Sequence, residues 1–181
     1  MPEAERELPP ITWAPGGMPQ AARDLGRFAA STDLMSAVLY GAPLPELLTS
    51  VAAHARTMAG ASLAFIALPD REANELRVAV AVGTGSDAIR DLTVRRGRSM
   101  IGRAFSTRRA LSARVAGDTA LPGLPPGPIL LLPLETGETV RGVLAVAGRP
   151  GDQSFDKPVA RELIRFADLA VRLVELAEAH R

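Results

Sequence analysis

The chain has 181 residues, 47% of them hydrophobic, which suits one compact domain with a substantial core plus an extra segment. Its net charge is +1, its first residues are acidic and polar, and no apolar run approaches the ~18 residues of a membrane-spanning helix, so we expect a cytoplasmic protein without a membrane helix or a secretory signal. Cysteine is absent, which excludes disulfides, thiolate nucleophiles, iron–sulfur ligation and cysteine-linked chromophores.

The N-terminal part divides into a linker and a helix. Residues 1–18 are rich in proline and glycine and have the composition of a flexible linker. A helix is expected over residues 19–41, ended by Gly41 and Pro43. Once Thr32 is counted, its apolar positions alternate spacings of three and four: Ala21, Leu25, Phe28, Met35 and Leu39. This heptad-like seam is typical of a helix that packs against another helix.

A second helix and two strands follow. The helix should run over residues 44–58, with Gly60 as its C-terminal stop and one apolar face made by Leu44, Leu48, Val51, Ala55 and Met58. Strands are predicted at residues 62–68 and 75–82, joined by a polar turn.

Shorter elements fill the middle of the chain. A helical turn at residues 86–90 leads to a strand near 92–94, and Ser99 is expected to cap a short helix that reaches Thr107. Another strand is predicted at residues 110–115. Residues 117–126 form a loop dense in glycine and proline, and loops of that length inside compact domains are often functional.

The last third predicts a hairpin and one long helix. Residues 127–134 and 140–148 are apolar runs of strand length around the turn 135–138, and Pro133 predicts a bulge or an irregular end because it lacks a ladder donor. From Asp156 the apolar period becomes that of a helix, with Asp156 or Ser154 as the N-cap. One apolar stripe contains Val159, Leu163, Phe166, Ala170, Leu173 and Ala177, and a second contains Ala160, Ile164, Ala167 and Val174. One stripe can cover the sheet while the other meets the first helix or a second subunit.

The whole pattern predicts an α+β fold with a central antiparallel sheet of about six strands, flanked by helices, with long N- and C-terminal helices. Three phrases in it resemble those of the GAF domain family of small-molecule sensory domains: Gly97 with Gly102, the strand Gly127 to Leu134, and Gly142-Val-Leu144. The resemblance covers about residues 44–175 and implies a GAF domain over residues 44–181, C-terminal helix included. Residues 59–70 and 166–179 resemble, more narrowly, the second of two tandem GAF domains in actinobacterial sensor histidine kinases of the DevS/DosT type.

This narrower resemblance implies a non-catalytic sensory or relay domain of a two-component sensor histidine kinase that responds to oxygen, nitric oxide or redox state. It implies neighbouring GAF and kinase domains in a longer chain and a homodimer through the terminal helices. The side chains expected to carry dimerisation and signalling are Leu25, Phe28, Met35, Leu39, Val159, Leu163, Phe166 and Leu173. The alternative is a receptor that binds an anionic or apolar metabolite in its own cavity. In the family the loop at 117–126 covers that cavity, so the expected pocket and lid residues are Arg98, Met100, Ile101, Phe105, Leu121, Leu124 and Ile129.

Cofactor and catalytic chemistry find little support in the residues. The two histidines, His54 and His180, have no metal-ligand spacing, so no metal is expected. Haem-binding first GAF domains of the resembled kinases carry a proximal histidine before the strand that here begins at Gly127, where this chain has Leu124-Pro-Pro-Gly, so haem is expected only in a neighbouring first GAF domain.

No cyclic-nucleotide signature, catalytic constellation or kinase box is present. The arginine-rich stretch of residues 90–114 holds one aromatic residue, Phe105, which argues against nucleic-acid binding. Those arginines could bind a phosphate, but we expect a solvated surface.

Overall fold

The computed structural model describes residues 19–72, 74–116 and 122–180. Its helices are α1 (Gln20–Leu39), α2 (Leu44–Ala59), α3 (Ser86–Ile89), α4 (Met100–Thr107) and α5 (Lys157–Ala179). Its strands are β1 (Leu63–Pro69), β2 (Glu75–Gly83), β3 (Thr93–Arg95), β4 (Leu111–Val115), β5 (Gly127–Thr136) and β6 (Thr139–Ala147). The predicted linker of residues 1–18 lies outside the described part.

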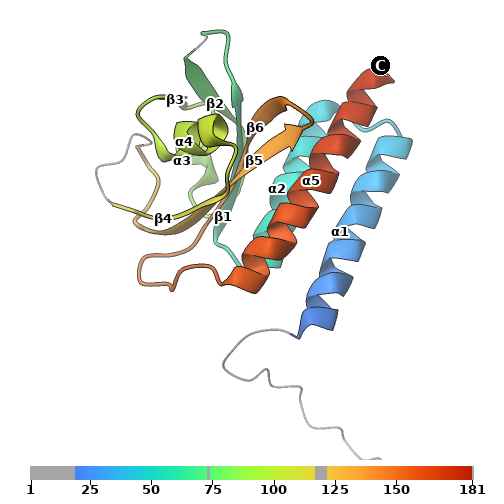
Figure 1. The fold of residues 1–181 in the computed structure, drawn as a ribbon, viewed down its shortest axis with the longest axis horizontal. Coiled ribbons are helices and arrows are strands. Elements are labelled where there is room, and N and C mark those ends of the chain that lie inside the picture. The colour runs from blue at the N-terminus through green and yellow to red at the C-terminus, as the bar shows by residue number, and fades with distance from the viewer. Residues whose placement is uncertain (1–18, 73, 117–121, 181) are drawn as a thin grey trace, which may run out of the picture.

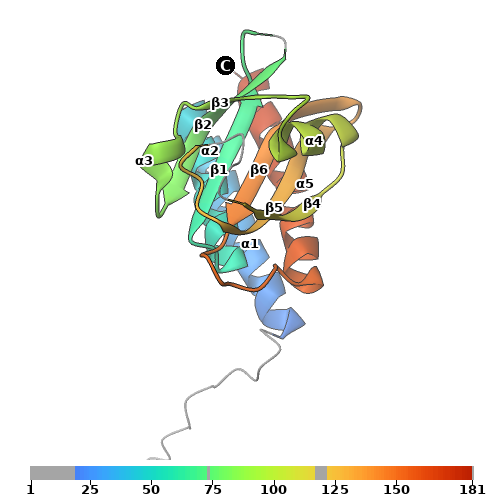
Figure 2. The same cartoon turned by 90° about the vertical axis from the view of Figure 1, so that its left-hand side faces the viewer.

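The strands form one six-stranded antiparallel sheet in the order β3-β2-β1-β6-β5-β4. Helices α1, α2 and α5 lie on one side of this sheet, while the short helices α3 and α4 lie on the other (Figures 1 and 2). The predicted α+β architecture with long terminal helices is therefore confirmed. None of the helices described here combines the length and the apolar character that crossing a membrane requires.

Two core clusters cover the two faces of the sheet, because successive strand residues point to opposite faces. In β1, for example, Ile66 belongs to the cluster under α2 and α5, whereas Phe65 belongs to the cluster under α3 and α4. Both side chains are fully buried. Burial on both faces explains why β1, β5 and β6 are almost continuously apolar in sequence.

Local sequence signals explain where elements end. The Asp156 carboxylate accepts a hydrogen bond from the Val159 amide at 2.9 Å, so Asp156 is the N-cap of α5. Ser99 caps α4 by accepting from the Gly102 amide at 2.9 Å, as predicted. Gly60 ends α2 in the left-handed region, with φ of 61°.

The β5–β6 hairpin is longer and tighter than the sequence predicts. Its ladder continues to the pair Thr136 and Thr139, so the loop consists of residues 137 and 138. Pro133 itself pairs with Val143, and the register shift follows one residue later, between Leu134 and Glu135. The predicted irregularity is thus present, displaced toward the turn.

Candidate functional site

The predicted pocket residues lie on the α3 and α4 side of the sheet, where they pack into the core. Ile101, Leu124 and Ile129 are buried, and Met100 and Phe105 pack against the same cluster. Arg98 is exposed, and Leu121 lies outside the described residues. The structure therefore brings five of these side chains together as packed core, and their role as ligand contacts stays a prediction.

Some arginines of the arginine-rich stretch contact other groups of the protein. Arg90 donates to Asp87 and to the Ala81 carbonyl, both at 2.9 Å, and the Arg96 guanidinium lies 4.5 Å from the centre of the Phe105 ring. These contacts within the protein were not predicted, and Arg95, Arg98, Arg103, Arg108 and Arg109 are exposed, as a solvated surface requires.

Both histidines lie on helices or at their ends, His54 in α2 and His180 at the C-terminal end of α5. The His54 imidazole is 3.5 Å from the Asp33 carboxylate on α1 and meets the Phe166 ring edge-on, and His180 ends α5. Within the described residues, no group of three or more histidine, aspartate and glutamate side chains is arranged to hold a metal ion. His54 thus serves as a contact between α1 and α2 here.

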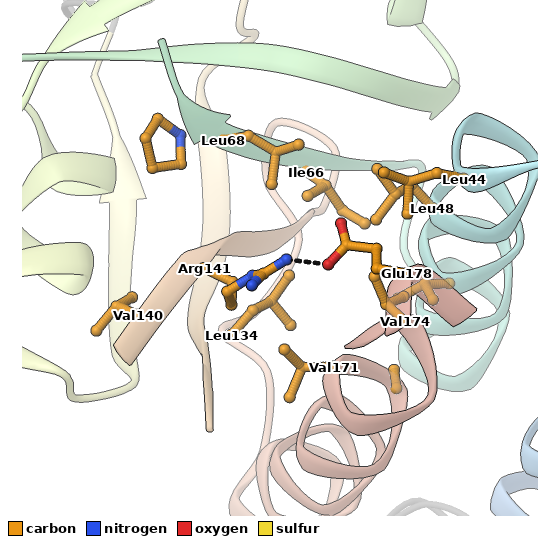
Figure 3. Close-up of a pocket in the computed structure, with 13 residues that line it drawn as sticks. Leu44, Leu48, Ile66, Leu68, Leu134, Val140, Arg141, Val171, Val174 and Glu178 are labelled. Atoms are coloured by element: carbon orange, nitrogen blue, oxygen red, sulfur yellow. Dashed lines mark hydrogen bonds and ion pairs between the residues drawn. The ribbon is translucent and has the colours of Figure 1, made fainter. Parts of the chain in front are cut away.

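A cavity of about 320 Å³ lies on the opposite side of the sheet, between α2, α5 and the ends of three strands (Figure 3). Its lining side chains come from five elements: Leu44, Leu48 and Val51 of α2, Ile66, Leu68 and Pro69 of β1, Leu134 of β5, Val140 and Arg141 of β6, and Ala170, Val171, Val174 and Glu178 of α5. Eleven of these thirteen residues are aliphatic, so the lining is apolar except for Arg141 and Glu178. None of the six predicted pocket residues that the structure describes lines it.

A charged cluster stands at the edge of this cavity. The Arg141 guanidinium on β6 donates to the Glu178 carboxylate on α5, and Figure 3 shows this pair over the apolar lining. The same guanidinium lies 3.8 Å from the Glu175 carboxylate, which also accepts a hydrogen bond from the Thr136 hydroxyl. All three charged side chains are about one-third exposed. The last turns of α5 are therefore held to the β5–β6 hairpin by polar contacts.

The terminal helices α1 and α5 pack side by side (Figure 1). Their predicted apolar seams differ in exposure to solvent. Helix α1 contacts the core through Ala30 and Leu34, both buried. Its predicted seam faces outward: Leu25, Phe28, Met35 and Leu39 are 70%, 61%, 49% and 79% exposed.

On α5 the predicted seam is instead mostly internal. Leu163, Phe166 and Leu173 are buried in the core of the same chain, and Val159 packs against it. These positions are therefore not available to a second subunit in this arrangement. The large apolar residues of α5 that are exposed are Ile164 and Leu176.

Exposed residues of the two helices border shared grooves. Phe28 and Met35 of α1 line one groove with Arg165 and Leu169 of α5. Leu39 lines another with Leu176. The outer surface of the α1–α5 pair thus carries an apolar strip along its length.

Comparison with known proteins decides the family. The sequence model of the GAF domain matches residues 44–175. This chain belongs to the GAF domain family. The match covers α2 through most of α5, and α1 precedes the matched residues.

Solved structures refine the comparison. This GAF domain is similar to the GAF-B domain of DevS from Mycobacterium smegmatis, with 29% identity over 77% of this chain and 98% of that one and a TM-score of 0.68. A second structure of that DevS domain gives 28% identity, the same coverage and a TM-score of 0.69.

The fold is also shared by the free methionine-R-sulfoxide reductase from Neisseria meningitidis. That enzyme is 19% identical over 88% of this chain and 94% of that one, with a TM-score of 0.69. At this identity the likeness concerns the fold alone.

Sequence reasoning missed the cavity beside α5. Its lining comes from residues 44 to 178, and the two residues of its ion pair are 37 positions apart. In sequence, Arg141 and Glu178 are an ordinary strand cation and helix anion. The available signal was the apolar face of α2 that begins at Leu44, which predicted packing against the sheet.

Proposed function

We propose that this GAF domain is a non-catalytic sensory or relay domain of a cytoplasmic two-component sensor histidine kinase, in a family that responds to oxygen, nitric oxide or redox state. The observation that carries the proposal is the similarity to the second GAF domain of DevS over nearly the whole of that domain. Neighbouring GAF and kinase domains of the same chain would be its partners, and nucleic acid would not.

The proposed route of the signal is the pair of terminal helices. Helices α1 and α5 lie together and present the outward strip formed by Leu25, Phe28, Met35 and Leu39 with Leu176. Apolar strips of this kind at helical spacing support helix pairing between subunits. Two packing arrangements of such helices would transmit a change in one domain to the next.

Light scattering of the purified protein tests this route. We expect a mass of twice the 19.0 kDa of the single chain at high concentration. The variant Phe28→Glu should be monomeric because it places a charge on the strip, whereas Ser112→Glu on β4 should associate like the wild type. A monomeric wild type at all concentrations contradicts relay through paired helices.

The domain itself is proposed to lack haem. The supporting observation is that His54 contacts Asp33 and Phe166 between the helices, away from the cluster under α3 and α4. Absorption spectra before and after the addition of haemin test this. A stable Soret band that His54→Ala removes would show that the domain binds haem directly, and no specific band is expected.

A second candidate is favoured by the cavity beside α5. A domain with an apolar cavity of about 320 Å³ has the space that small-molecule sites use. The domain would then be a receptor in its own right.

A further inference from the structure

We propose that the cavity beside α5 binds a compact aliphatic molecule that carries an ammonium group. The cavity lies between the sheet and helices α2 and α5, on the side opposite to the predicted pocket residues. The inference rests on the proposed function only for its consequence at the helices, and not for binding itself.

The size and lining of the cavity define the body of the ligand. With about 30 Å³ for each small group in a condensed phase, 320 Å³ holds on the order of ten non-hydrogen atoms. The interior walls are methyl and methylene groups, from side chains such as Leu48, Ile66 and Val171. Such walls offer dispersion contacts and no hydrogen-bond partner, so the buried part of the ligand must be aliphatic.

The charges at the mouth define the head group. Arg141 is shared between Glu175 and Glu178, so this cluster has two carboxylates for one guanidinium and a net charge of −1. An ammonium group neutralises that excess negative charge. A carboxylate head group would have to displace Glu178 from Arg141 and would meet the excess negative charge.

The position of the charged cluster gives binding a consequence for α5. Glu178 is one residue before the end of α5, and its pair with Arg141 holds that end to β6. An ammonium group that draws Glu175 and Glu178 toward itself weakens their pairing with Arg141. The occupied cavity would thereby change how the last turns of α5 are held, which is the helix of the proposed relay.

Titration calorimetry with three six-carbon probes tests the site: hexylamine, hexan-1-ol and hexanoate. We expect hexylamine to bind most tightly and hexanoate to bind at least about fivefold more weakly, the factor equivalent to ~1 kcal/mol for one charge pair at 4 Å in water. Tightest binding by hexanoate, or no heat from any probe at millimolar concentration, overturns the proposal.

Variants locate the binding. Val174→Trp should fill the cavity and weaken hexylamine binding by more than tenfold, while Leu176→Trp, on the outer side of the same helix, should leave it unchanged. Leu68→Phe narrows the cavity from the sheet side and gives the same loss should Val174→Trp fail to fold. Equal binding by Val174→Trp or Leu68→Phe and the wild type contradicts this location.

The head-group argument has a separate test. The double variant Glu175→Gln with Glu178→Gln should abolish the preference for hexylamine over hexan-1-ol while hexan-1-ol still binds. A preference that survives in this variant overturns the role of the two carboxylates. Light scattering of the same samples distinguishes the binding site from the proposed relay. A monomeric wild type that binds hexylamine contradicts only the relay. A dimer that binds none of the probes contradicts only the site.

Discussion

A guanidinium nitrogen of Arg27 on α1 lies 3.4 Å from a carboxylate oxygen of Glu162 on α5. Glu162 is only 4% exposed, and its other oxygen accepts a hydrogen bond from the Gln20 amide at 2.9 Å. Two residues of α1 therefore share one buried carboxylate of α5. Because this distance is longer than a hydrogen bond, the contact is an ion pair across the helix interface.

Removing this carboxylate should loosen α1. In Glu162→Ala, Gln20 and the partly buried Arg27 lose their contact with α5 and keep only Asp24 of their own helix, so we expect the free energy of unfolding to fall by about 1–3 kcal/mol. Urea denaturation measures the loss, and amide hydrogen exchange should show faster exchange in α1 than in the wild type. Asp24→Ala is the matched control because Asp24 contacts the same Gln20 and Arg27 from a more exposed position, and it should change stability by less than about 0.5 kcal/mol. An equal loss in both variants would contradict a special role for the buried carboxylate.

Gly142 on β6 should not tolerate a side chain. A Cβ atom there would lie 2.5 Å from the backbone oxygen of Ala67 on β1, which a rigid central strand pair cannot relieve. Gly142→Ala is expected to lower the free energy of unfolding by about 1–3 kcal/mol through overpacking. Gly97→Ala provides the contrast, because a Cβ atom at Gly97 meets nothing within 4 Å. Thermal melts that show the same shift for both variants would refute this account.

The sequence predicts most of the fold because, within most elements, the apolar residues keep the spacing of one type of secondary structure. The strands around Phe65 and Leu144 and the helix after Asp156 carry uninterrupted apolar patterns, and the predicted bounds agree with the structure within a few residues. Gly60 ends α2 as predicted. Gly102 lets α4 approach the Arg96 backbone, where a Cβ atom would lie 2.0 Å from the Arg96 carbonyl oxygen. Local chemistry is enough for such features.

The orientation of helical faces required the tertiary structure. On α1, the large residues Leu25 and Phe28 face outward, whereas the core contacts are made by Ala30 and Leu34. The spacing of apolar residues identifies candidate faces but not which one meets the domain, because the large side chains can serve a second helix as well as a core. The cavity beside α5 was not predicted for a related reason, since its five contributing elements, from α2 to α5, supply only one to four residues each.

The start of α5 depends on one of the two candidate caps. The Asp156 side chain accepts from the Val159 amide, so Asp156→Ala should lower the free energy of unfolding by about 0.5–2 kcal/mol. Ser154 is exposed and precedes the helix by three residues, and Ser154→Ala should change stability by less than about 0.5 kcal/mol. Urea denaturation of the two variants distinguishes them. A larger loss from Ser154→Ala would mean that the helix begins earlier in solution.

A negative charge introduced into α5 should reduce stability on the buried side of the helix and self-association on the exposed side. Leu173 is buried in the core under the sheet, whereas Leu176 is 48% exposed beside Leu39 of α1. Leu173→Glu places a carboxylate among apolar side chains and should lower the free energy of unfolding by more than about 4 kcal/mol, enough to unfold many domains. Leu176→Glu should leave the thermal midpoint nearly unchanged and weaken self-association, because its carboxylate stays hydrated in the monomer but would be buried against a second subunit. Circular dichroism melts and light scattering on both variants check this, and a Leu176→Glu protein that associates as tightly as the wild type would place any dimer interface elsewhere on the domain.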